Sequence, residues 1–176
     1  ASGRGVNVAV IDRGTGTLQA LQQFDTFCQN VGEPGCPQTT QEPCQALLAT
    51  VTSLTPGDVV LVAVADTATS PGFPDGMANP RMAACRQALS ALGGQQGSAI
   101  RFSQPYALIA IAGGSSVNLA EALGAADSTV QVAADAVLDA DRDGIPDPLD
   151  PDNDNDAVSD AIERARGTDV LDPASF

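Results

Sequence analysis

Acidic residues near the C-terminus recur at a spacing that suits a hard metal ion. The alternation of aspartates begins at Asp139 and begins again, in the same phase, at Asp152. Calcium prefers about six to eight oxygen ligands, and an EF-type loop supplies them from positions 1, 3, 5, 7, 9 and 12. Each run fills those positions with carboxylates and, at position 7, with a backbone carbonyl. The first run comprises Asp139, Asp141, Asp143, Ile145, Asp147 and Asp150, and the second comprises Asp152, Asp154, Asp156, Val158, Asp160 and Glu163.

The turn at position 6 differs between the two runs. Gly144 occupies it in the first run, whereas Ala157 occupies it in the second. An alanine with positive φ is strained, because only glycine lacks the Cβ that opposes this conformation. The alternative meaning of such a charge run is a solvated acidic linker. We favour calcium, and more than one ion, because both runs fill every ligand position of an EF-type loop in matching phase. Crowded carboxylates would also repel one another without a cation.

The same segment carries a family resemblance. The sequence DADRDGIPDPLDPDNDNDAVSDAIE over residues 139–163, followed by Gly167-Thr168-Asp169, resembles thrombospondin type 3 repeats and related bacterial calcium-binding repeats. In those repeats neighbouring loops share ligands around a line of ions. The resemblance implies that Asp150 and Asp152 are shared carboxylates here. It covers only the tail, which we take as a separate segment over residues 139–176.

Charge and composition exclude several classes of partner. The 176-residue chain has a formal net charge of −14, and residues from Asp139 onward hold 12 of its acids against 3 arginines. Such a chain repels nucleic acid and anionic membranes, so we expect neither as a partner. No apolar run is long enough to cross a bilayer. No signal peptide is present, which predicts a mature or trimmed form, and arginine as the sole strong base suggests a GC-rich, bacterial genome.

The residue types also argue against catalysis. The sequence contains no histidine, which removes the usual general base and the commonest zinc ligand. The isolated acids outside the tail fit caps and turns better than a pair of catalytic carboxylates. We therefore expect no enzyme activity. These acids are Asp12, Asp25, Asp58, Asp66 and Asp75.

The four cysteines predict an oxidising environment. They form no CxxC pair, which argues against a metal or redox site, and their even number fits two disulfides in any of three pairings. Four free buried thiols are the alternative, but calcium loops point outside the cell, so we favour disulfides and a secreted or cell-surface location. We expect Cys28 to pair with Cys36 around a Gly- and Pro-rich tip, and Cys44 to tie to Cys85 between two helices.

Residues 1–138 have the pattern of a mixed α/β domain. Apolar runs predict strands, the one at 58–65 being central and covered on both faces. Proline and asparagine at helix starts predict two longer helices. The loop at 66–79 is long enough to be functional or mobile. The expected strands are 6–11, 18–27, 58–65, 99–102, 106–112 and 129–134, and the expected helices are 44–54, 80–92 and 117–123.

Several pieces of this domain resemble the interleukin-like EMT inducer family. They occur in order over most of residues 3–114: GRGVNVAVID at 3–12, Thr15-Gly16, FDTF at 24–27, PGDVVLVAVAD at 56–66, LSALG at 89–93 and AGG at 112–114. The resemblance implies an α/β fold, with a two-sheet mixed or antiparallel β core flanked by helices, to which we add an irregular calcium-bound tail. It also implies a secreted or lumenal protein.

The same resemblance implies a binding site. The family includes cytokine-like proteins and the sugar-recognising stem domain of protein O-mannose N-acetylglucosaminyltransferase. Its sugar contacts imply roles for Arg4 and Asp66 at one end of the sheet, and Tyr106 matches an aromatic position. A third arginine is replaced by Ser103, for which Arg101 could substitute. The alternative is a purely structural role, in which Arg4 and Asp66 form only a salt bridge.

The sequence therefore predicts a non-catalytic extracellular carbohydrate-binding module with a calcium-stabilised C-terminal connector. Its partner would be a glycan, with N-acetylglucosamine as a candidate component. The alternative function is a cytokine-like or cell-surface protein-interaction domain that binds an extracellular protein and no sugar.

Overall fold

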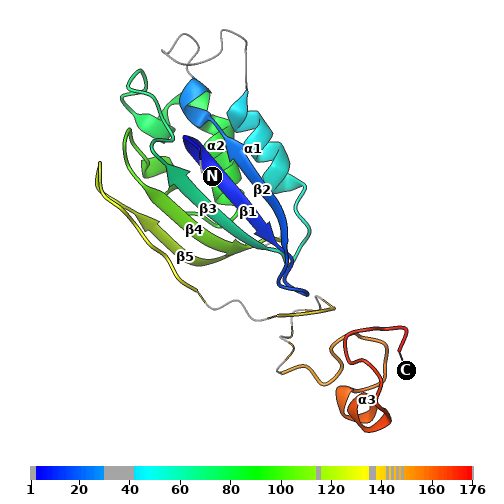
Figure 1. Ribbon diagram of the computed structural model, residues 1–176. Coiled ribbons are helices and arrows are strands. Elements are labelled where there is room, and N and C mark those ends of the chain that lie inside the picture. Colours follow the sequence, from blue (N-terminus) through cyan, green and yellow to red (C-terminus); the bar gives the residue numbers. More distant parts are fainter. Residues whose placement is uncertain are drawn as a thin grey trace.

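The structure is a computed structural model that describes residues 3–29, 42–113, 116–134, 138–141, 143, 145, 147 and 149–175 (Figure 1). Its centre is one five-stranded antiparallel sheet with the strand order β2-β1-β3-β4-β5. The strands are β1 (Gly5–Ile11), β2 (Leu18–Phe24), β3 (Val59–Ala65), β4 (Tyr106–Ile111) and β5 (Val117–Leu123). The helices are α1 (Pro43–Thr52), α2 (Ala83–Ala91) and α3 (Asp160–Arg166), with short 3-10 helices at Thr26–Gln29, Gly76–Ala78, Pro80–Met82 and Gly97–Ala99.

Four predicted strands and the two longer predicted helices are confirmed. In β1 the alternating residues Val6, Val8 and Val10 point to the core, as a strand with one buried face requires. Pro43 begins α1, and the Asn79 side chain accepts a hydrogen bond from the Arg81 amide at the 3-10 turn that precedes α2. Local signals were therefore sufficient for these elements.

The predicted second sheet is absent from the described residues, because two expected strands do not form. Residues 97–99 make a 3-10 helix, and the fully buried Ile100 accepts a hydrogen bond from the Met77 amide instead of joining a ladder. Residues 129–134 belong to no strand. The prediction of a helix at 117–123 is also wrong. That segment is β5, which pairs with β4 from Tyr106↔Leu123 to Ile111↔Val117.

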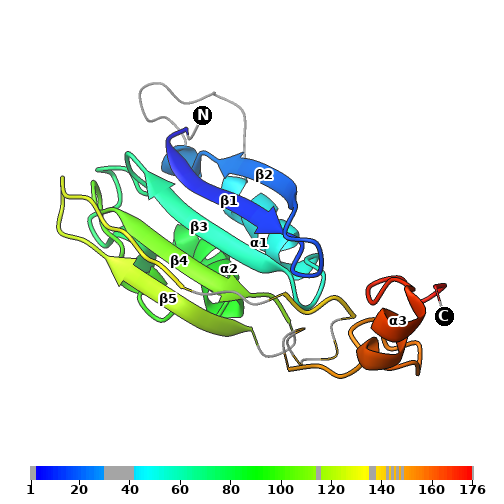
Figure 2. The ribbon, with the colours of Figure 1, turned by 60° about the horizontal axis from the view of Figure 1, so that its bottom comes forward.

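The core lies on one face of the sheet. α1 and α2 pack side by side against that face and are joined by the predicted Cys44–Cys85 disulfide, whose Cα atoms are 4.6 Å apart (Figures 1 and 2). Cys36 lies outside the described residues, so its pairing with Cys28 stays a prediction. Val60, Val62 and Val64 of β3 are buried beneath the helices, as are their counterparts on β1 and β4.

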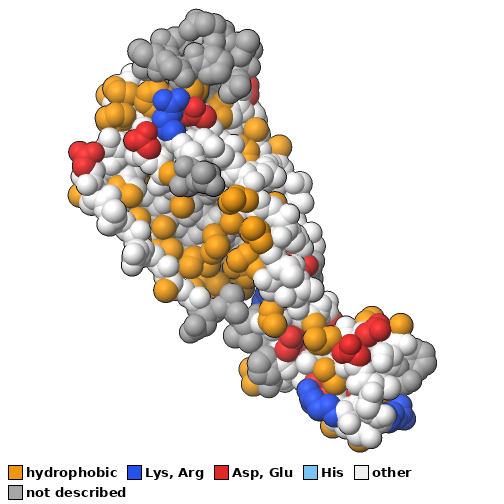
Figure 3. Space-filling view, in the orientation of Figure 1, with side chains coloured by type: hydrophobic (Ala, Val, Ile, Leu, Met, Phe, Trp, Pro, Cys, Tyr) orange, Lys and Arg blue, Asp and Glu red, His pale blue; other side chains and the backbone are white. Residues whose placement is uncertain are grey.

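The opposite face of the sheet is open and uncharged. Contrary to expectation, β3 is only partly covered on its second side: Val59 is buried there and Leu61 and Ala65 are half-buried, but Ala63 is exposed. One row of cross-strand neighbours runs over all five strands as Leu21, Ala9, Leu61, Ile109 and Ala120. Figure 3 shows apolar side chains gathered over this face. The burial pattern therefore departs from that of a sheet covered on both faces.

The C-terminal segment leaves the sheet and meets the domain beside the turn between β1 and β2 (Figures 1 and 2). There Arg13 forms an ion pair with Asp139. Beyond that point the acidic loops lead into α3, which ends at Gly167 in a left-handed conformation. Among the described residues, no helix combines the length and hydropathy that a bilayer crossing requires.

Candidate functional site

The two acidic loops fold alike. In the first loop, Asp147 Oδ1 accepts a hydrogen bond from the Ala140 amide at 2.7 Å, and the Asp147 amide donates to the Leu138 carbonyl at 2.9 Å. In the second loop, Asp160 Oδ1 accepts from the amide of Asn153 at 2.9 Å, and the Asp160 amide donates to the carbonyl of residue 151, also at 2.9 Å. The sequence repeat is therefore also a structural repeat.

A second pair of equivalent hydrogen bonds orients the side chains of the alternating aspartates. Asp141 Oδ1 accepts from the Asp143 amide at 3.0 Å, and Asp143 Oδ1 accepts from the Ile145 amide at 2.7 Å. The second loop repeats these contacts between Asp154 and Asp156 at 3.3 Å and between Asp156 and the amide of residue 158 at 2.7 Å. Each carboxylate is thus aimed by the chain that carries it, a turn that aspartate readily forms.

These turns bring the carboxylates together. Asp139, Asp141 and Asp143 each offer a ligand atom within 4.8 Å of the others, and Asp152, Asp154 and Asp156 form a second such group. The residues at positions 1, 3 and 5 of each predicted loop are therefore close together in space. Ile145 and Val158, the predicted carbonyl donors, occupy the equivalent place in the two loops.

Glu163, in the first turn of α3, lies near enough to the second cluster for the charges of Asp154 and Asp156 to act on it. Its side chain is fully buried, yet neither carboxylate oxygen has a hydrogen-bond partner. Asp152 Oδ1, Asp154 Oδ2 and Asp156 Oδ2 are likewise buried and without a hydrogen bond. Five carboxylate oxygens thus lack the partners that buried polar groups normally have. Three single oxygens and one two-oxygen glutamate are the carboxylate set of an EF-type loop.

The electrostatics of this cluster disfavour an ionised, cation-free state. Burial, followed by the carboxylates of Asp154 and Asp156, raises the pKa of Glu163 above its ordinary value. Burial and then Asp156 raise the pKa of Asp154 in the same way. Both shifts arise because low dielectric and like charges penalise the anion. A bound divalent cation would remove that penalty.

Other predicted ligands hold different positions. Both oxygens of Asp160 are already engaged, one by the Asn153 amide and the other by Arg164 at 2.7 Å. Position 9 of an EF-type loop often binds through water, which this arrangement allows. Asp150 Oδ1 accepts from the amide of Asp152 at 2.9 Å, so the two residues predicted to be shared lie at the junction of the loops.

Ala157 adopts the conformation that its place in the loop demands. Its φ is +74°, in the left-handed region, and its amide donates to Asp152 Oδ2 at 3.1 Å. This position is glycine in the first loop and in EF-type loops generally. The strain anticipated for an alanine here is therefore present.

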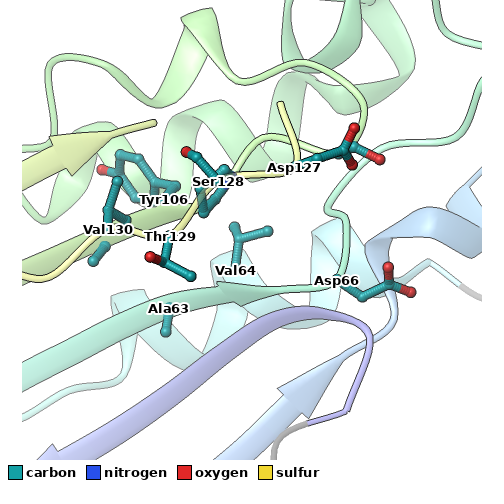
Figure 4. A pocket seen from close by; sticks show the side chains of 11 residues that line it. Ala63, Val64, Asp66, Tyr106, Asp127, Ser128, Thr129 and Val130 are labelled. Carbon is teal, nitrogen blue, oxygen red and sulfur yellow. The ribbon is translucent and has the colours of Figure 1, made fainter. Parts of the chain in front are cut away.

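The predicted carbohydrate-binding residues fall into two groups. Asp66, Ser103 and Tyr106 line one cavity of about 510 Å³ beside β3 and β4, whereas Arg4 and Arg101 do not (Figure 4). The carboxylates of Asp66 and Asp127 lie toward one end of this cavity. The complete lining is Ala63, Val64, Asp66, Ser103, Pro105, Tyr106, Ala107, Asp127, Ser128, Thr129 and Val130.

Unusual backbone conformations concentrate at this cavity. Asp66, Ser103 and Asp127 all have positive φ, at 60°, 56° and 58°. The other described residues with positive φ that are not glycine are Asn155 and Ala157 of the second acidic loop. Ser103 is held by a bond from its amide to the Thr67 hydroxyl and by one from the Asp127 amide to its carbonyl. Such strained positions cluster at functional sites more often than elsewhere.

Arg4 is engaged outside the cavity. It makes a bidentate pair with Asp25, with contacts of 3.0 and 2.7 Å, and its guanidinium lies 4.1 Å from the centre of the Phe27 ring. Hydrogen bonding to Asp25, with a smaller effect of Asp66, raises the pKa of Arg4. Because Gly5 pairs with Ala65, Arg4 and Asp66 do lie at the same end of the sheet. The salt bridge, however, is formed with Asp25.

Arg101 and Tyr106 are also committed to local contacts. Arg101 Nη1 donates to the Ser98 carbonyl at 3.2 Å. Tyr106 is only 1% exposed and its hydroxyl donates to Glu121, so its ring forms a wall of the cavity and offers no broad stacking surface. Asp127, Ser128 and Thr129 were not singled out from the sequence, because an ordinary polar turn gives no local sign that it folds back beside β4.

Comparison with known proteins supplies the family. The family model described as interleukin-like EMT inducer matches residues 4–114, which is well over half of the chain. No curated protein matches. The matched region contains β1 to β4, both core helices and the Cys44–Cys85 disulfide, and the family fits an extracellular, non-catalytic domain. This chain therefore belongs to the interleukin-like EMT inducer family.

Proposed function

We propose that the C-terminal segment of this extracellular protein binds calcium, and that the second loop is the better-formed site. The observation that carries this proposal is the set of five buried carboxylate oxygens without hydrogen bonds, contributed by Asp152, Asp154, Asp156 and Glu163. Their burial and mutual repulsion are costly unless a cation lies among them.

The donor set favours calcium over magnesium. Five carboxylate oxygens supply most of the ligands. With the Val158 carbonyl and the water that often binds at position 9, they would give about seven, which is typical of calcium. Magnesium instead takes an octahedral shell of about six and retains several waters. The first loop has the same hydrogen bonds and an equivalent aspartate cluster, so a second ion binds there.

Isothermal titration of the protein with calcium tests this function. We expect more than one ion, with dissociation constants of about 0.1–1 mM or tighter, and weaker binding of magnesium. Glu163→Gln removes one charge and one potential oxygen ligand and should weaken one ion at least tenfold. Asp75→Asn is the matched control, because this exposed acid lies in the domain and makes no side-chain cap. Unchanged titration of Glu163→Gln would reject the site.

The cavity beside β3 and β4 favours carbohydrate binding as a second function. Two acidic residues, Asp66 and Asp127, and three residues with hydroxyls, Ser103, Ser128 and Thr129, line it together with apolar side chains. Carboxylates are strong acceptors for sugar hydroxyls. The three positive-φ residues at its edge support a binding role. No arginine lines it, so the arrangement suits a neutral sugar, including one with N-acetylglucosamine, better than an anionic one.

A glycan array, probed with and without calcium, tests this second function. Asp66→Asn should abolish binding while leaving the domain folded, because asparagine also tolerates positive φ and no hydrogen bond joins the Asp66 side chain to the described residues. The Asp75→Asn variant should bind as the wild type does. If no glycan binds the wild type, this function is rejected.

The alternative function, a protein-interaction domain that binds no sugar, is favoured by the open face of the sheet. Its central row of apolar side chains carries no charge on a chain whose net charge is −14. Leu61→Asp together with Ile109→Asp would place two charges in that row. Loss of binding to a cell-surface protein in this variant, with glycan binding absent in the wild type, would favour the alternative.

A further inference from the structure

The first acidic loop is held against the domain by an ion pair between residues far apart in the sequence. Arg13, in the turn between β1 and β2, contacts Asp139 Oδ2 through Nη1 at 2.7 Å. Both side chains are largely buried, with 13% and 2% of their surfaces exposed. A pair this shielded is screened by salt much less than a surface contact.

The backbones approach closely at the same place. A Cβ atom on Gly14 would lie 3.1 Å from the carbonyl oxygen of Ala140 and 3.4 Å from its Cα. One on Gly16 would lie 3.8 Å from the Leu138 side chain. A Cβ on Gly14 would also lie 3.3 Å from Asp12 Oδ1, so a larger residue at position 14 would crowd both the loop and the turn that receives it.

The turn that receives the loop is fixed by its own contacts. Asp12 Oδ1 accepts from the Thr15 amide at 2.8 Å, and Asp12 Oδ2 accepts from the Gln19 side chain at 2.7 Å. The Asp12 amide also donates to the Thr17 carbonyl at 2.9 Å. The turn that carries Arg13 is thus held by bonds within the domain and not by the tail.

We infer that Arg13 and Gly14 are positioning residues for the first calcium loop, so that calcium binding there and docking of the tail are one coupled equilibrium. This inference rests on the proposed calcium function. Arg13 takes one oxygen of Asp139, a residue that also offers a ligand atom to the group with Asp141 and Asp143. A guanidinium that orients a ligand in this way acts as the outer partner of a metal site.

The coupling follows from electrostatics. Without a cation, the three clustered carboxylates repel one another, which favours an open loop and removes Asp139 from Arg13. With calcium, the loop closes and Asp139 stays in contact. Because coupling between sites is reciprocal, a docked tail must also strengthen calcium binding at this loop.

Arg13 has two opposing effects on affinity, so one variant alone is insufficient. Its positive charge repels calcium, while its hydrogen bond orients Asp139. Gly14→Val separates the two effects, because it crowds Ala140, and also Asp12 Oδ1, without changing any charge. Gly113→Val is the matched control, since a Cβ there meets nothing within 4 Å. Arg166→Ala is the charge control, removing an exposed arginine of α3.

Nitrogen-15 relaxation of the complete protein, titrated with calcium, tests the inference. In the wild type with calcium, amides of α3 should tumble with those of β3, and chelation should make the α3 amides tumble independently. Arg13→Ala and Gly14→Val should show independent tumbling even at saturating calcium. Gly14→Val should also weaken the first loop by about fivefold or more while the second loop keeps its affinity.

The possible outcomes distinguish failure of this inference from failure of the proposed calcium function. A wild type that binds no calcium in either loop overturns both. Calcium binding with a tail that stays docked after chelation overturns the coupling alone. So does a Gly14→Val variant with wild-type affinity at the first loop and a docked tail. The two controls should match the wild type in tumbling, and undocking in both would remove the roles given to Arg13 and Gly14.

Discussion

Tyr106 donates a hydrogen bond of 2.7 Å to Glu121, and this pair ties β4 to β5 beneath the loop that follows α2. The same carboxylate accepts from the Gln95 amide at 3.0 Å, the Gln96 amide at 2.8 Å and the Asn118 side chain at 3.0 Å. Two oxygens thus accept four hydrogen bonds, which is the acceptor capacity of a carboxylate. Glu121 therefore joins β4, β5 and the loop after α2 at this edge of the sheet.

Glu121 should make stability depend on pH. Burial alone would raise the pKa of Glu121, but the hydrogen bonds, led by that of the Gln95 amide, outweigh burial and hold the pKa below its ordinary value of 4.5. A carboxyl whose pKa is lower in the folded state contributes stability above its unfolded pKa and loses it as pH falls through the folded value. Urea unfolding from pH 7 to pH 3 should show Glu121→Gln to be less stable at neutral pH, by a margin that shrinks on acidification.

The acidic tail does not obscure this measurement. Asp154 and Glu163 have raised pKa values, so their contribution to stability changes in the opposite direction, but it is common to both proteins and cancels in the difference. Tyr106→Phe removes one bond and keeps the carboxylate. It should cost about 1 kcal/mol and preserve most of the pH dependence. A constant difference between Glu121→Gln and the wild type across this range would contradict the role of its charge.

The Cys44–Cys85 disulfide should contribute strongly to stability. It joins α1 to α2 and closes a sequence separation of 41 residues. Replacing both cysteines with alanine should lower the free energy of unfolding by about 2–4 kcal/mol. Alanine is preferable to serine because both positions are fully buried and a hydroxyl would lack a partner. Chemical denaturation measures the change, and a loss below about 1 kcal/mol would contradict the contribution to stability expected of this disulfide.

The elements that can be predicted from the sequence are those whose structure is decided locally. The valine alternation of β1, the apolar run of β3 and the proline before α1 each specify an element within a few residues. The acidic loops belong to the same class, because their turns are made by aspartates bonding to the amide two residues on. The spacing of the carboxylates along the chain therefore corresponds to their clustering in space.

Elements and contacts that depend on tertiary structure could not be predicted from the sequence. The segment 117–123 contains Leu, Ala and Glu, which favour helix, yet pairing with β4 and the bonds to Glu121 make it a strand. A register shift between Ile109 and Ala110 places Val117 and Leu123 on opposite faces, so the segment has no simple apolar alternation. The contact between Arg13 and Asp139 spans 126 residues and has no local signature. The location of Asp127 at the same cavity as Asp66 depends in the same way on how the chain folds back.

Removing calcium should expose α3 to protease. The helix begins at Asp160 and carries Glu163, so both its first turn and its buried carboxylate depend on the second loop. If calcium stabilises only the closed loop, an excess of about tenfold over the dissociation constant should slow cleavage after Arg164 and Arg166 by roughly tenfold. Trypsin digestion followed by mass spectrometry measures these rates.

The domain supplies the control for that digestion. Arg81 and Arg101 are exposed and lie far from the tail in sequence, so cleavage after them should proceed at equal rates with and without calcium. A calcium effect of the same size at all four sites would reflect the protease and not the tail. Equal rates at Arg164 and Arg166 in both conditions would contradict stabilisation of α3 by the ion.

Ala157→Gly should strengthen calcium binding at the second loop. The native φ of +74° costs an alanine about 1–2 kcal/mol, and glycine avoids this cost while losing more entropy on ordering. The net gain should be about 0.5–1 kcal/mol, or roughly two- to fivefold in the dissociation constant. The gain falls on calcium binding because the left-handed turn directs the amide of residue 157 to Asp152, a proposed ligand.

Ala165→Gly provides the matched comparison, since this residue is helical in α3 and glycine there should destabilise by about 1 kcal/mol. Calorimetry of both variants should give affinity changes of opposite sign, and weaker binding in both would mean that backbone strain at Ala157 does not limit the site.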